Sequence, residues 1–83
     1  MNQHQIAITA NASADVMERV LRVTRHRGFM VQQMAMSHHE NALQLTMTVS
    51  SERPISSLYH QLDKLWDVQD IELTSTQKQQ LSA

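Results

Sequence analysis

Histidines and carboxylates are the side chains of this sequence that could ligate a metal ion or transfer a proton. The histidines are scattered along the chain, at His4, His26, His38, His39 and His60. His38 and His39 are neighbours, and adjacent side chains rarely chelate one metal ion without ligands from elsewhere. The spacing therefore predicts solvent-exposed histidines and no metal site.

Motifs for nucleophilic catalysis and phosphate binding are absent from the sequence. It contains no cysteine, which excludes thiolate zinc sites and cysteine catalysis. Gly28 is its single glycine, so neither a glycine-rich phosphate loop nor a Gly-x-Ser-x-Gly elbow can be built. The chain is predicted not to be an enzyme and to carry no cofactor of its own.

Length and composition limit the partners that this chain can have. It has 83 residues, 41% of them apolar and 18% charged, which is typical of one globular domain. The net charge of -1 gives no overall attraction for nucleic acid or an anionic membrane. No apolar run approaches the roughly 20 residues of a membrane helix, and the N-terminus lacks a secretory signal. We expect a cytoplasmic protein with no membrane and no nucleic-acid partner.

The first half of the sequence passes from a strand-like pattern to a helical one and back. Residues 3–10 alternate in polarity as a half-buried strand does. From Val16 the apolar residues recur at helical spacing, with Ser13 at the expected N-cap and Gly28 as a left-handed C-cap. Residues 29–37 are strand-like, and the phase of their pattern changes near Gln32 and Gln33, which predicts a β-bulge. A polar turn is expected at residues 38–41.

The second half repeats this arrangement. Residues 42–50 alternate cleanly and predict a strand with one buried face. Pro54 fits the first turn of a second helix, in which Tyr59 and Trp66 lie on the apolar arc and are expected to anchor the core. Residues 67–74 read as a last strand. The domain is therefore expected to span residues 1–74, followed by a polar tail at residues 75–83.

The order strand, helix, strand, strand, helix, strand is that of the ferredoxin-like βαββαβ plan, in the α+β class. Right-handed connections then place both helices on one face of a four-stranded antiparallel sheet. The other face is left to solvent or to a partner.

Two surface features leave several interpretations open. A basic stripe on the first helix, containing Arg19, Arg22 and Arg25, fits a solvated helix face, a protein-partner face or an RNA-binding face. The strand at residues 43–50 has no aromatic residue on which a base could stack, which argues against RNA. The methionines at positions 30, 34 and 36 fit either ordinary packing or an adaptable partner-facing edge.

Three segments together resemble a known family. They are residues 18–29 (ERVLRVTRHRGF), residues 34–36 (MAM) and residues 61–68 (QLDKLWDV). In this order and spacing they resemble the small regulatory subunits of acetolactate synthase, most closely the short isozyme II type. The resemblance covers nearly all of residues 3–74.

The resemblance implies an ACT domain that forms a homodimer through its second strand. It also implies a non-catalytic subunit that binds, stabilises and activates a large catalytic subunit in branched-chain amino acid (isoleucine and valine) biosynthesis. That large subunit is expected to carry thiamine diphosphate, Mg²⁺ and FAD. The alternative is a stand-alone amino-acid-binding ACT module that regulates another enzyme. The candidate partner-interface residues are Arg19, Arg22, Arg25, Met34 and Met36.

One departure from the family concerns the turn after the first strand. Valine-responsive relatives have an Asn followed by a Gly there, whereas residues 11–15 of this chain read NASAD. Asp15 would repel the carboxylate of an effector, so the sequence predicts weak or absent inhibition by valine. If an effector does bind, the resemblance points to Asn11, Ser13, Ala14 and Asp15, with Met30 and Val31 contributed across the dimer.

Overall fold

The computed structural model describes residues 2–13 and 15–75. Six elements follow one another along the chain: β1 (Asn2–Asn11), α1 (Val16–His26), β2 (Met30–His39), β3 (Ala42–Ser51), α2 (Ile55–Asp63) and β4 (Val68–Ser75). The predicted order of strands and helices is therefore confirmed. β4 continues to Ser75, and the predicted tail beyond that residue lies outside the described part of the chain.

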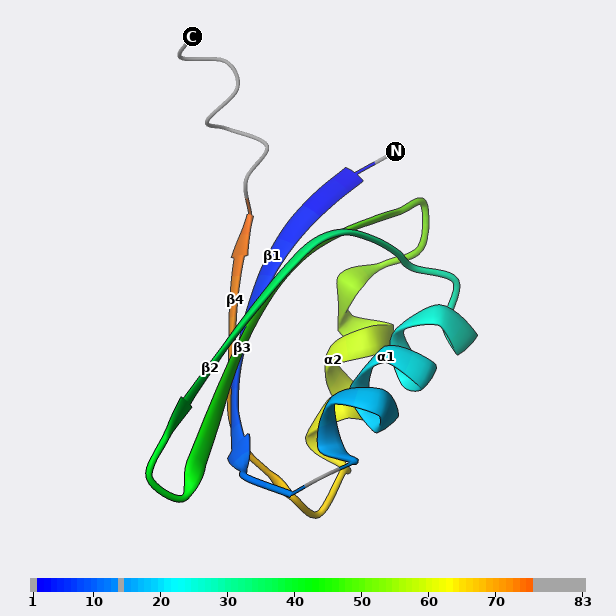
Figure 1. Ribbon diagram of the computed structural model, residues 1–83. Helices are drawn as coiled ribbons and strands as arrows, with labels where there is room; N and C mark the ends of the chain where they lie inside the picture. The colour runs from blue at the N-terminus through cyan, green and yellow to red at the C-terminus, as the bar shows by residue number, and fades with distance from the viewer. Residues whose placement is uncertain (1, 14, 76–83) are drawn as a thin grey trace, which may run out of the picture.

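The strands form one antiparallel sheet in the spatial order β2-β3-β1-β4. Both helices pack on the same face of this sheet, and among the residues that the structure describes no helix lies on the opposite face (Figure 1). This is the ferredoxin-like α+β arrangement expected from the sequence. β2 and β4 are the two edge strands, so each has one side without a paired strand.

The core lies between the sheet and the two helices. The alternation along β3 places Leu43, Leu45, Met47 and Val49 inward, and all four are buried. Ile6, Ile8 and Ala10 of β1 pair beside them in the centre of the sheet. The helices close this layer with five buried side chains: Val16, Val20, Thr24, Leu58 and Leu62.

α1 ends as the sequence predicts, at a left-handed glycine. Gly28 has φ +87°, and its N–H donates to the carbonyl of Arg25 at 3.0 Å. The N–H of Phe29 reaches back to the carbonyl of Thr24 at 3.1 Å. These two bonds make a Schellman motif, which satisfies carbonyls at the end of the helix and turns Phe29 into the core.

The predicted bulge in β2 is confirmed. The register against β3 shifts between Val31 and Gln33, so that Gln32 is the additional residue. The shift returns Met34 and Met36 to the helix side of the sheet, opposite Met47 and Leu45. The turn that follows is shorter than predicted because the strand continues through His38 and His39.

The structure corrects the predicted ends of both helices. Ser13 does not cap α1, because Asp15 occupies the N-cap position. Pro54 is the N-cap of α2 rather than part of its first turn. α2 ends at Asp63, three residues before Trp66, and Trp66 is 77% exposed. The prediction that Trp66 anchors the core is therefore wrong, whereas Tyr59 is half-buried against the core.

Candidate functional site

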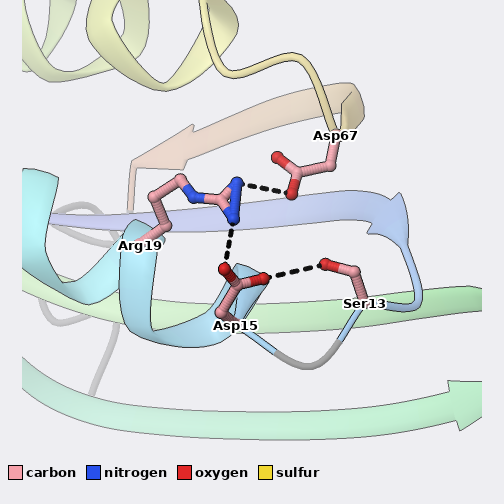
Figure 2. Close-up of polar contacts among 4 residues, drawn as sticks. All are labelled: Ser13, Asp15, Arg19 and Asp67. Carbon is pink, nitrogen blue, oxygen red and sulfur yellow. Dashed lines mark hydrogen bonds and ion pairs between the residues drawn. The ribbon is translucent and has the colours of Figure 1, made fainter.

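Three charged side chains meet at the end of the sheet where β1 leads into α1 and α2 leads into β4. Arg19 donates to Asp67 at 2.8 Å and forms an ion pair with Asp15 at 2.7 Å (Figure 2). The hydroxyl of Ser13 donates to the other oxygen of Asp15 at 3.3 Å. The guanidinium of Arg19 therefore joins two carboxylates from turns that are far apart in the sequence.

Asp67 is the buried member of this group. Its side chain is 0% exposed, and its Oδ1 has no hydrogen-bond partner within the described part of the chain. Its backbone carbonyl accepts a hydrogen bond from the N–H of Asn11 at 2.8 Å. An uncompensated carboxylate is costly in such a place, so Arg19 stabilises the junction between the β1–α1 and α2–β4 turns.

The electrostatics of the site follow from these contacts. The hydrogen bond from Arg19 is the main cause that lowers the pKa of Asp15, and the same contact is the main cause that raises the pKa of Arg19. Asp15 therefore does not present an isolated negative charge to the β1–α1 turn. Since one arginine serves two carboxylates, the group of Asp15, Arg19 and Asp67 still carries one net negative charge.

Sequence reasoning missed this arrangement. It placed Arg19 on a basic stripe whose role was left open and read Asp67 as the first residue of a strand, whereas β4 begins at Val68. The side chain of Arg19 is only 24% exposed. Arg19 and Asp67 are 48 residues apart, and no local pattern marks a pair that only the fold brings together.

The candidate effector residues fall into two separate groups. Asn11, Ser13 and Asp15 lie at the β1–α1 turn, and Ala14 lies outside the described residues. Met30 and Val31 lie at the opposite end of the sheet, because Met30 pairs with Ser50 while Asn11 pairs with Ala42. At about 3.4 Å per residue along β3, the two groups are roughly 27 Å apart. One chain alone therefore does not bring them together.

Each group borders its own pocket. Beside the β1–α1 turn, a pocket of about 380 Å³ is lined by residues that include Ser13, Met17, Met36 and His38. At the opposite end, a pocket of about 540 Å³ is lined by Leu21, Arg25, Gly28, Phe29, Met30 and Val31. Both pockets are lined in part by apolar side chains and by residues of β2.

The candidate partner-interface residues include both exposed side chains and side chains that are held within the fold. Arg22 and Arg25 are exposed on α1, as predicted, whereas Arg19 is committed to Asp15 and Asp67. Met36 is 52% exposed beside the free edge of β2, while Met34 is half-buried against the core. The predicted stripe is therefore not one continuous solvated surface.

The part of the chain that the structure describes has neither a metal-binding cluster nor a membrane-spanning helix. Residues 2–13 and 15–75 contain no group of three or more histidine, cysteine or acidic side chains that could hold a metal ion. Across the same residues, no helix has the length and apolar character needed to cross a membrane.

Comparisons with known proteins agree with the fold. The model of the ACT domain family matches residues 12–71. The ACT domain from GTP pyrophosphokinase of Chlorobium tepidum superimposes with a TM-score of 0.76 at 11% identity, covering 87% of this chain and 96% of that one. The acetolactate synthase small subunit from Thermotoga maritima has a TM-score of 0.75 at 20% identity, covering 88% of this chain and 47% of that one. These likenesses establish the class of protein as an ACT domain.

Sequence similarity identifies the particular family of ACT domain proteins to which this chain belongs. The small subunit of acetolactate synthase isozyme 2 from Escherichia coli (strain K12) is 40% identical over 87 aligned positions, which cover 100% of both chains. This chain therefore belongs to the family of acetolactate synthase isozyme 2 small subunits, within the ACT domain family. The resemblance seen in the sequence is confirmed.

Proposed function

We propose that this chain is a non-catalytic regulatory subunit that binds, stabilises and activates a large catalytic subunit of acetolactate synthase. The observation that carries this proposal is the similarity to the E. coli small subunit along the whole of both chains. The large subunit would supply the chemistry, with thiamine diphosphate, Mg²⁺ and FAD, in the cytoplasm. The small subunit would act by binding the active arrangement of its partner more tightly than the inactive one.

The free edge of β2 supports a homodimer. Residues 30–37 include no charged side chain, and Met30 and Met36 are more than half exposed. An uncharged edge of this kind favours pairing with another strand. β4, the other edge, carries exposed Asp70 and Glu72, and such charges disfavour strand pairing. We therefore propose that two copies join through β2 into one continuous sheet.

This pairing would also assemble the two groups of candidate effector residues. If two β2 strands pair antiparallel, Met30 and Val31 of one copy lie near the β1–α1 turn of the other. Asn11, Ser13 and Asp15 would then face them across the interface. We propose that valine binds weakly there, because the Asp15–Arg19–Asp67 group carries a net negative charge and the turn has no glycine.

The test is a valine titration of acetolactate formation by a purified large subunit, with and without this chain. We expect the chain to raise the rate several-fold and valine to leave the raised rate nearly unchanged. Strong inhibition at sub-millimolar valine would overturn the effector proposal alone. No rise at any ratio of the two chains would favour a stand-alone amino-acid sensor that acts on another enzyme.

A further inference from the structure

An exposed tryptophan lies in the turn between α2 and β4. Trp66 is the single tryptophan of the chain and is 77% exposed. The guanidinium carbon of Arg19 lies 5.9 Å from the centre of its ring, within the range of a cation–π contact. Because Asp15 and Asp67 both hold Arg19, the indole rests against a fixed cation.

Further cationic side chains follow Arg19 along α1 and line a pocket beside α2. Arg22, Val23 and His26 follow Arg19 at helical spacings of three, four and seven residues, so they share one side of α1. With Arg27 and with Gln61 of α2 they line a pocket of about 260 Å³. Arg22 and Arg27 are exposed, and the ion pairs found over residues 2–13 and 15–75 are those of Arg19.

The composition of this surface is that of a protein-binding site. Tryptophan and arginine are the residue types most enriched among those that dominate binding energy at interfaces. Here an exposed tryptophan in contact with Arg19 lies near arginines that have no anionic partner in the described residues. The complementary surface is an apolar recess with acidic groups at its rim.

If two copies pair through β2, as proposed above, the second copy does not cover Trp66. Trp66 lies two residues before the start of β4, and β4 lies at the edge of the sheet opposite β2. A dimer that pairs through β2 therefore leaves Trp66 facing outward on each copy. The surface is available to a different partner.

We propose that Trp66, Arg22 and Arg27 form the surface that docks onto an acid-rimmed apolar recess of the large catalytic subunit. This inference rests on the proposed function. Arg19 is a positioning residue here, since it holds the indole while its own charge is occupied by Asp15 and Asp67. Of the arginines predicted from the sequence to contact a partner, Arg25 lies apart from this surface, in the pocket beside Met30.

A fluorine label on the single tryptophan tests the proposal directly. The full chain is prepared with 5-fluorotryptophan, and its ¹⁹F spectrum is recorded while unlabelled large subunit is added, with acetolactate formation followed in the same samples. We expect the chemical shift of the resonance to change in proportion to activation, beyond the broadening that a larger complex causes at any site. Activation with an unchanged chemical shift would refute the docking surface and leave the proposed function intact. If neither activation nor binding occurs, the proposed function fails and this inference falls with it.

Substitutions provide the second test. We expect Trp66→Ala to raise the concentration needed for half-maximal activation by about 30-fold, and Arg22→Glu by about 10-fold. Trp66→Phe should recover part of the loss, because an aromatic ring remains. Arg53→Glu is the matched control, since this exposed arginine lies beside Gly28 and away from Trp66, and it should change the value less than two-fold. Equal effects of Arg22→Glu and Arg53→Glu would overturn the assignment.

Discussion

Replacement of Gly28 by alanine tests how the end of α1 is built. Gly28 has φ +87°, where an alanine is disfavoured by about 1–2 kcal/mol. An added Cβ would also lie 3.0 Å from Nε and 3.2 Å from Cδ of Arg53. Because the side chain of Arg53 is long and exposed, it can move, so backbone strain accounts for most of the loss. We expect Gly28→Ala to lower the free energy of unfolding by about 1–2 kcal/mol.

Urea denaturation and thermal melting of the full chain, at one protein concentration, measure this effect. A loss of that size corresponds to a melting temperature lower by about 5–15 °C in a domain of this length. Gly28→Asn should lose less, since asparagine tolerates the left-handed conformation better than alanine. The double variant Gly28→Ala with Arg53→Ala separates the two causes, with Arg53→Ala alone as its control.

Two outcomes would refute this reasoning about Gly28. If Gly28→Ala is as stable as the parent chain, the left-handed cap does not constrain the fold. If the double variant regains full stability, contact with Arg53 is the cause and backbone strain is not.

Three further predictions concern the core, the charged group and the free edge. Leu62→Ala removes a fully buried side chain and should cost about 2–5 kcal/mol in urea denaturation, whereas Leu73→Ala, at a position 41% exposed, should cost much less. Arg19 lowers the pKa of Asp15, so any stability advantage over Asp15→Asn should exist above about pH 4 and be lost as the pH falls through that lowered pKa; an advantage that does not diminish as the pH is lowered below about 4 would contradict this. Ala35→Glu on β2 should yield monomers by light scattering, while Thr46→Glu, on the neighbouring strand β3, should leave the dimer intact; the reverse result would exclude pairing through β2.

Much of the fold could be predicted because its causes are local. The alternation of Leu43, Leu45, Met47 and Val49 sets the buried face of β3 without reference to the rest of the chain. A change of phase near Gln32 is visible in the sequence, and so is a single glycine after a helical pattern. Each of these features acts within a few residues.

The site was harder to predict because it depends on contacts between residues that are far apart in the sequence. Helical spacing of apolar residues continues through Leu65 and Trp66, yet the chain tightens at Lys64, whose N–H donates to the carbonyl of Gln61 at 3.3 Å. That tighter turn directs Trp66 outward and Asp67 inward. The partner of Asp67 is Arg19, which lies 48 residues earlier, so the pair forms only when α1 packs beside the α2–β4 turn.

The most direct test of the central claim is a titration of purified large catalytic subunit with this chain, following acetolactate formation and the mass of the complex together. We predict a rate that rises several-fold and saturates at a fixed ratio of the two chains, with a complex of matching composition. A rate and a mass that stay at the values of the large subunit alone would contradict the assignment as its regulatory subunit.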